Sequence, residues 1–155
     1  MRGHLAALLG LGASLMCGAA IAETALPAEP QALIDYREAQ MKEMGGAIKR
    51  AGDAATAAGE AKAVAAKALS IAAAMETFFP ETTAPGAAGV EKTRALANIW
   101  SDAAGFAAAR EKLLIAVDSL NAAVNAGDAA GIAAAKDESI AACKSCHETF
   151  RGPED

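Results

Sequence analysis

The sequence predicts an all-α protein, an antiparallel bundle of four helices in one domain. Hydrophobic residues make up 54% of the 155 residues, alanine is the commonest of them, and aromatic residues reach only 4%. Alanine, lysine and glutamate favour helices, whereas the β-branched and aromatic residues that favour strands are scarce. Apolar residues also recur every three or four positions in four long segments with short connections, which is typical of a bundle. The sequence shows no strand pattern, internal repeat or second domain.

The first two helices are predicted from this periodicity. The first spans residues 31–51, where the stripe consists of Leu33, Ile34, Arg37, Met41, Met44 and Ile48. Gly45 and Gly46 lie inside it at a cost in helix stability, so they allow the close approach of a flat ligand or of another helix. A turn at residues 53–59 leads to the second helix, which ends at Pro80 and carries the stripe Val64, Ala68, Ile71, Met75, Phe78 and Phe79.

The other two helices follow an irregular stretch. Residues 81–90 contain two glycines and a proline, and residues 92–100 are expected to form a short helical turn. The third long helix spans residues 101–125. Asp128 is expected to cap the fourth, which continues through Arg151 and stops at Gly152 and Pro153. Tyr36 and Trp100 are expected to make packing contacts.

Residues 1–22 have the features of a cleavable export signal. Arg2 is followed by an apolar run, and Ala20, Ile21 and Ala22 fit the small-residue rule for cleavage. A membrane anchor is the alternative, since 18 uncharged residues precede residue 23. The glycines in the run and the polar stretch after it favour cleavage, which would also remove Cys17. The mature domain is then 23–155, a soluble periplasmic protein with no membrane segment.

Two cysteines and a histidine near the C-terminus predict the cofactor. Cys143 and Cys146 are separated by two residues and followed directly by His147, which is the attachment motif of c-type haem. On a helix the three side chains share a face, so the thiols can form thioethers with the haem vinyl groups while the imidazole binds iron. The sequence therefore predicts one covalent haem c per chain, with His147 as a metal ligand.

Other uses of two cysteines fit less well. A thioredoxin-like pair needs a βαβ setting. A structural zinc site needs four ligands, whereas the mature chain offers two thiols and one imidazole, with Glu148 poorly spaced. A disulfide between residues three apart on a helix would be strained. Because the only histidine of the mature domain is committed to iron, hydrolytic triads are excluded.

Three further side chains are candidates for the haem site. Met41 shares a face of the first helix with Arg37, and its thioether is either the second iron ligand or a core-packing group. A methionine and histidine pair of ligands raises the reduction potential and is typical of an electron carrier. Arg37 and Arg151 are candidates for pairing with the haem propionates, with solvation at the surface as the alternative. Arg151 follows His147 by four residues.

The sequence at these positions resembles the cytochrome c-prime family, the class II c-type cytochromes. The resemblance rests on Cys-Lys-Ser-Cys-His-Glu-Thr-Phe-Arg at 143–151, Tyr-Arg-Glu-Ala-Gln-Met-Lys-Glu-Met-Gly-Gly at 36–46 and Ile-Trp at 99–100. It implies a four-helix bundle with a haem attached to Cys143 and Cys146, Arg37 near a propionate and Arg151 beside the face bound by His147. Family members divide at the position of Met41. High-spin members carry a bulky non-ligand there and bind nitric oxide or carbon monoxide, and low-spin members carry a methionine bound to iron.

These features favour a periplasmic electron carrier with His147 and Met41 on the iron. The alternative is a five-coordinate haem that binds nitric oxide or carbon monoxide. We do not expect an enzyme such as a peroxidase, because no second histidine is left to move protons. The net charge of −5 argues against nucleic acid and suits a basic redox partner of unknown identity. The resemblance, with alanine-rich first helices, implies a homodimer.

Overall fold

The computed structural model describes residues 25–153, which form a four-helix bundle with a fifth, very short helix. The helices are α1 (Pro30–Ala51), α2 (Ala58–Ala74), α3 (Asn98–Ser101), α4 (Ala103–Ala126) and α5 (Ala129–Phe150). Two 3-10 turns, Met75–Phe78 and Glu81–Thr83, follow α2. The predicted all-α fold and its four long helices are confirmed. The predicted export signal at 1–22, with Cys17, lies outside the described residues.

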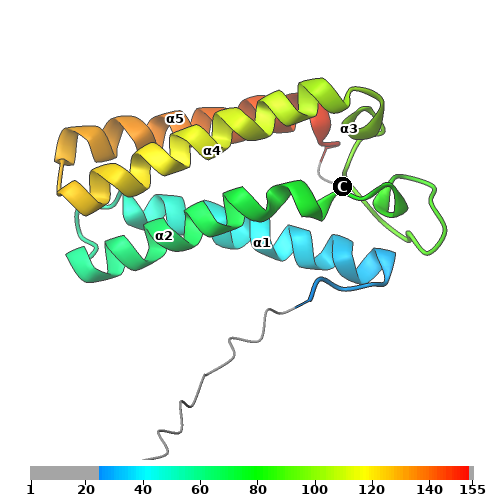
Figure 1. Ribbon diagram of the computed structural model, residues 1–155, viewed down its shortest axis with the longest axis horizontal. Coiled ribbons are helices and arrows are strands. Elements are labelled where there is room, and N and C mark those ends of the chain that lie inside the picture. The colour runs from blue at the N-terminus through cyan, green and yellow to red at the C-terminus, as the bar shows by residue number, and fades with distance from the viewer. Residues whose placement is uncertain (1–24, 154–155) are drawn as a thin grey trace, which may run out of the picture.

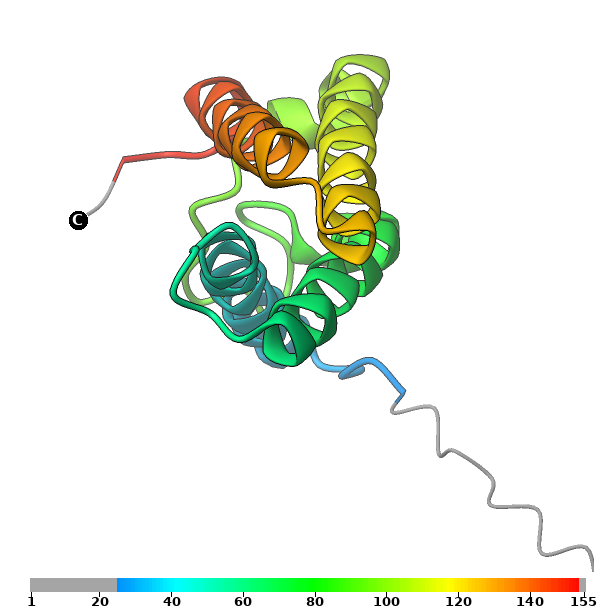
Figure 2. The same ribbon diagram turned by 90° about the vertical axis from the view of Figure 1, so that its left-hand side faces the viewer.

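The four long helices run alternately up and down and pack as two pairs. Figure 1 shows the pair α4 and α5 lying along the pair α1 and α2, with the irregular segment between α2 and α4 at one end. The end-on view in Figure 2 places α1 beside α2, α4 above α2, and α5 beside α4 and above α1. Direct packing is dense between α4 and α5 and between α1 and α2, and sparse between α1 and α5. The bundle is therefore open along its α1–α5 side.

Local sequence signals set the ends of the helices. Pro30 lies in the first turn of α1, where its missing N–H costs nothing. The carboxylates of Asp102 and Asp128 accept hydrogen bonds from the backbone N–H of Gly105 and Gly131, which caps α4 and α5. Gly127 ends α4 with a φ of 69°, a conformation that favours glycine. Both residues of the turn between α4 and α5, Gly127 and Asp128, therefore have a defined structural role.

Two clusters of buried side chains hold the bundle together. The larger runs along its length and includes Met44, Ala47, Ile48, Ala65, Ala68, Ile71, Met75, Phe78, Val117 and Leu120. The smaller, at the end that carries the irregular segment, consists of Ile99, Phe106 and Phe150, with Phe79 and Trp100 packed against it. The rings of Phe79 and Phe150 both contact Phe106 edge to face, at centroid distances of 4.9 and 5.2 Å. This aromatic cluster fixes the end of α5 against α4.

The irregular segment is fastened to α1 and α5 by side-chain hydrogen bonds. The Gln31 side-chain oxygen accepts from the N–H groups of Glu91 and Lys92. Trp100 Nε1 donates to the carbonyl of Phe79 over 3.1 Å, and the ring of Tyr36 meets that of Phe78 edge to face. The packing roles expected for Tyr36 and Trp100 are confirmed. The segment is thus held at several points beside the open side of the bundle.

Two details differ from the sequence expectation. The short helix begins at Asn98 rather than residue 92, because Leu96 and the residues before it extend along the chain end instead. Helix α5 ends at Phe150, and Arg151 is extended and forms an isolated bridge with Ala95.

Ser139 is fully buried on α5, where its hydroxyl donates to the carbonyl of Ala135. In residues 25–153, no helix is long and apolar enough to span a membrane.

Candidate functional site

The open side of the bundle contains a cavity of about 750 Å³. Pockets that hold cofactors and small ligands have volumes of roughly 300–1,000 Å³. One wall is formed by α1, the opposite wall by the last turns of α5, and the end wall by apolar side chains of α4 and of the segment after α2. The apolar part of this lining includes Met44, Met75, Phe79, Ile99, Phe106, Leu113 and Phe150. The cavity is therefore suited to a large and mainly apolar group.

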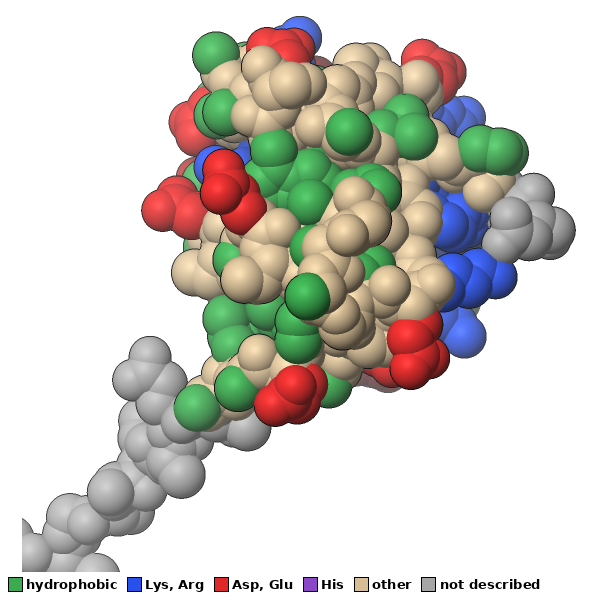
Figure 3. All heavy atoms as spheres, turned by 90° about the vertical axis from the view of Figure 1, so that its right-hand side faces the viewer, with side chains coloured by type: hydrophobic (Ala, Val, Ile, Leu, Met, Phe, Trp, Pro, Cys, Tyr) green, Lys and Arg blue, Asp and Glu red, His purple; other side chains and the backbone are tan. Residues whose placement is uncertain are grey.

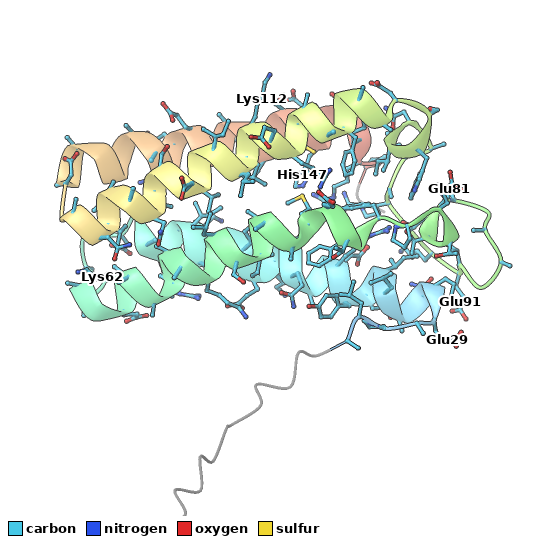
Figure 4. The ribbon with its side chains drawn as sticks, viewed as in Figure 1. Glu29, Lys62, Glu81, Glu91, Lys112 and His147 are labelled. Carbon is cyan, nitrogen blue, oxygen red and sulfur yellow. The ribbon has the colours of Figure 1, made fainter. Side chains whose placement is uncertain are left out.

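The α5 wall presents the three residues of the predicted attachment motif. Cys143, Cys146 and His147 all line the cavity, as their spacing on one helical face requires. The two half-buried cysteines are not disulfide-bonded. Figure 4 shows His147 pointing from α5 towards the pair α1 and α2, across the space between the walls. The structure thus brings the predicted thiols and imidazole to one wall.

The surroundings of the two cysteines and of His147 shift their pKa values. Burial raises the pKa of the Cys143 thiol, and burial with the neighbouring Cys143 raises the pKa of Cys146. The pKa of His147 is lowered, first by desolvation and then by the positive charges of Arg151 and Arg94. His147 is therefore neutral at pH 7, which leaves an imidazole lone pair for a metal.

The α1 wall carries Met41 opposite the motif. Met41 is half-buried, lines the cavity and packs against the main core. Gly45 lies one turn further along α1 and also lines the cavity. Met41 and His147 thus line the same cavity from opposite walls. Both roles considered for Met41, iron ligand and packing group, are compatible with this position.

Arg37 is a buried cation at the edge of the same cavity. Only 3% of it is exposed, and it lines the cavity while its guanidinium lies 4.7 Å from the centre of the Phe79 ring. Its Nη1 and Nη2 donate to the hydroxyls of Thr83 and Thr93 over 2.9 and 2.6 Å. Burial lowers the pKa of Arg37, against the raising effect of Glu38. Because its hydrogen-bond acceptors are uncharged, an anionic group in the cavity would offset the desolvation of this cation.

Arg151 lies beside His147, as its position in the sequence predicted. Its Nη1 is 3.4 Å from Nδ1 of His147, although Arg151 follows the end of α5 rather than continuing it. Both residues line the cavity. Figure 3 shows Lys and Arg side chains gathered along one edge of this end of the molecule. The chain is acidic as a whole, whereas the basic residues that line the cavity, Arg37, Lys42, Arg94 and Arg151, outnumber the acidic ones, Asp35 and Glu38.

Arg94 is a site residue that the sequence did not reveal. Its Nε and Nη2 donate to the carbonyls of Pro153 and Gly152 over 2.9 and 3.0 Å, and Gly152 N–H donates back to the carbonyl of Arg94 over 2.7 Å. Asn98 adds a 2.8 Å hydrogen bond to the carbonyl of Thr149. The bond from Asn98 satisfies a carbonyl in the last turn of α5, and the bonds of Arg94 hold the residues that follow this helix. The sequence signal was weak, since Arg94 is a single arginine in an irregular stretch.

The residues present fit a covalently attached haem. Two adjacent thiols and a neutral imidazole occupy one wall, and apolar side chains line the interior. The buried Arg37, with uncharged acceptors, lies where a carboxylate of the cofactor would compensate it. A structural zinc site fits less well than haem. Within residues 25–153, no group of three or more His, Cys, Asp or Glu residues could hold a metal ion.

Comparison with known proteins agrees with this geometry. The family model described as Cytochrome C' matches residues 32–151. The chain is 38% identical to a cytochrome c' of Pararhodospirillum photometricum over 124 residues, which cover 80% of this chain and 99% of that protein.

Solved structures of such proteins share the fold. The cytochrome c' of Rubrivivax gelatinosus is 35% identical, with a TM-score of 0.70 over 80% of this chain and 98% of the other. The nitric oxide complex of a mutant cytochrome c prime of Alcaligenes xylosoxidans is 28% identical, with a TM-score of 0.70 over 83% and 99% of the two chains.

Proposed function

Because the chain belongs to the cytochrome c' family, we propose that its haem c is five-coordinate and binds nitric oxide or carbon monoxide on the side of Met41. One haem c per chain, covalently attached, is the cofactor. The observation that carries the proposal is the match to cytochromes c' along the whole bundle, including one solved as a nitric oxide complex. When bound, the haem supplies an iron centre that accepts a diatomic ligand.

The α5 wall holds the cofactor in this proposal. Cys143 and Cys146 fix the haem edge through two thioethers, and His147 provides the protein ligand through its neutral imidazole. Arg94 and Asn98 hold the end of α5 and so limit the movement of His147. Arg37 and Arg151 provide positive charge for the propionates from opposite sides of the cavity.

Met41 has a steric role in this proposal. Its side chain packs against the main core, so apolar neighbours hold the thioether on the α1 wall. A large apolar group there excludes water and restricts the approach to the iron, while a small diatomic ligand can enter by displacing it. The relatives favour this gas-binding function over the electron carrier with Met41 on the iron. Electron carriage remains the rival function, because Met41 and His147 do line one cavity.

Optical spectra distinguish the two functions. We expect broad high-spin bands from the ferrous protein, saturable binding of carbon monoxide, and little change of spin state in Met41→Ala. Met41→Leu is the matched control, since it preserves the apolar volume and removes the sulfur. Sharp low-spin bands in the wild type that become high-spin in both variants would establish Met41 as a ligand and contradict the proposal.

Export and assembly complete the proposal. Residues 1–22 direct the chain to the periplasm and are removed, and α1 and α2 mediate a homodimer. The motif at 143–147 supports export, because bacteria attach c-type haem outside the cytoplasm. N-terminal sequencing of the secreted protein and sedimentation of the purified holoprotein test these two statements. We propose no catalytic activity, and a redox partner is not part of this function.

A further inference from the structure

Residues 93–98, here called the strap, form hydrogen bonds with both walls of the cavity. They are the last part of the irregular segment between α2 and α4, and α3 begins at their final residue. Direct packing between α1 and α5 is sparse. The placement of one wall relative to the other at this end of the bundle therefore depends on the chain that bridges them.

The strap is bonded to the α1 wall through Thr93. The hydroxyl oxygen of Thr93 accepts a hydrogen bond of 2.6 Å from Nη2 of Arg37 and one of 3.2 Å from the backbone N–H of Ala95. Arg37 is a buried cation on α1, and hydrogen bonds from a charged donor are stronger than those between neutral groups. One threonine side chain thus joins α1 to the backbone of the strap.

The strap is bonded to the α5 wall through the residues around the end of that helix. Ala95 forms an antiparallel bridge with Arg151, and the residues on either side of this pair are joined by backbone hydrogen bonds of 2.7 and 3.1 Å. The N–H of Arg151 also donates to the carbonyl of His147 over 3.2 Å. At the other end of the strap, the Asn98 side chain donates to the carbonyl of Thr149 over 2.8 Å.

A continuous path of contacts therefore runs from Arg37 on one wall to His147 on the other. Groups outside the ligand set orient a metal-binding histidine, and small changes in their positions alter the bond between the histidine and the metal. We propose that Thr93 is a positioning residue for His147, which acts through the strap and determines the strength of the iron–histidine bond. This inference rests on the proposed function, in which His147 is the protein ligand of a five-coordinate iron.

The test measures the iron–histidine stretching band of the ferrous holoprotein by resonance Raman spectroscopy. A five-coordinate haem gives this band, and its frequency reports the strength of the bond. We expect Thr93→Val to shift the band to lower frequency, because valine has a similar shape but accepts no hydrogen bond from Arg37 or Ala95. Thr93→Ser keeps the hydroxyl and should retain the wild-type band.

A second variant tests the other end of the strap. Asn98→Ala removes the bond to Thr149 and should shift the band in the same direction as Thr93→Val. The shift in the double variant should be smaller than the sum of the two single shifts, because both residues act through one segment.

Thr83→Val is the matched control. Thr83 also accepts a hydrogen bond from Arg37, over 2.9 Å, and is fully buried, but it lies in the 3-10 turn Glu81–Thr83 and not in the strap. Thr83→Val and Thr93→Val should lose similar resistance to urea, whereas only Thr93→Val should shift the band. The comparison separates the positioning of His147 from a general loss of stability.

Different results overturn different statements. A wild-type band that is unchanged in Thr93→Val, or shifted equally in Thr83→Val, contradicts the role of Thr93 and leaves the proposed function standing. If Thr93→Val fails to take up haem, Asn98→Ala decides in its place, and an unshifted band there overturns the role of the strap. A ferrous wild type that is low-spin and lacks the band overturns the proposed function itself, and the role of Thr93 with it.

Discussion

Arg37 and Thr83, 46 residues apart in the chain, form a buried hydrogen bond in which Arg37 Nη1 donates to Thr83 Oγ1 over 2.9 Å. Thr83 is fully buried, and its hydroxyl donates in turn to the carbonyl of Pro80 over 2.8 Å. A second bond joins Arg37 to Thr93. One side chain of α1 thus holds two points of the irregular segment and also faces the cavity, so the order of that segment and the shape of the site depend on the same residue.

The first prediction tests this link through Thr83→Val. Valine matches the shape of threonine but leaves a buried guanidinium donor and the Pro80 carbonyl without the hydroxyl. We expect the holoprotein to lose about 1–3 kcal/mol of unfolding free energy, the usual cost of an unsatisfied buried polar group. Urea unfolding followed by circular dichroism measures it. Thr77→Val is the control, because its hydroxyl makes the same type of bond to Ala74 at an exposed position.

The second prediction concerns the charge of Arg37. A buried cation near the haem favours the reduced, less positive state, so Arg37→Gln should lower the reduction potential. At an effective dielectric constant near 20, such a charge contributes on the order of one to a few kcal/mol at cavity distances. Redox titration monitored by absorbance measures the shift. Arg37→Lys should retain much of the potential, and Lys49→Gln, exposed in the last turn of α1, should leave it unchanged. Equal potentials in all variants would remove Arg37 from the haem environment.

Most of the fold could be predicted from the sequence, because helix periodicity and caps are local. The stripe of α1 and the cap at Asp128 depend on residues within a few positions, and the structure has both. The contacts of the irregular segment are different. Thr83 and Arg94 have no periodic signal, and their partners lie 46 and about 58 residues away. Such bonds depend on how the helices pack, which a single sequence does not specify.

The candidate site likewise contains residues whose role could be predicted from the sequence and one, Met41, whose role could not. Cys143, Cys146 and His147 were predictable because helix geometry alone places them on one face. The position of Met41 across the cavity was predictable once α1 was assigned. Its chemical role was not, since a thioether on an apolar stripe can either pack or bind iron. Comparison with relatives, rather than local pattern, favours the gas-binding function.

The third prediction addresses the aromatic cluster behind the cavity. Phe106 is nearly buried between Phe79 and Phe150. Phe106→Ala should cost about 3–5 kcal/mol of unfolding free energy and leave a void beside the last turn of α5. Ile115→Ala, on the same helix but 58% exposed, should cost far less. Urea unfolding of both variants measures the difference. Similar losses at the two positions would show that this cluster does not anchor α5.

The fourth prediction separates stability from the site. Asp128 caps α5 at the end remote from His147, where its Oδ1 accepts a 3.1 Å hydrogen bond from the N–H of Gly131. Asp128→Ala should therefore cost about 0.5–2 kcal/mol, the usual effect of losing a cap. Asp137→Ala, exposed inside the same helix, removes one negative charge without a cap and controls for net charge. Since the cap lies several turns from the haem motif, the absorption spectra and the carbon monoxide association rate of Asp128→Ala should match those of the wild type. A changed rate at unchanged haem content would mean that α5 transmits the state of its first turn to His147, and the helix could then no longer be treated as a rigid support for the haem.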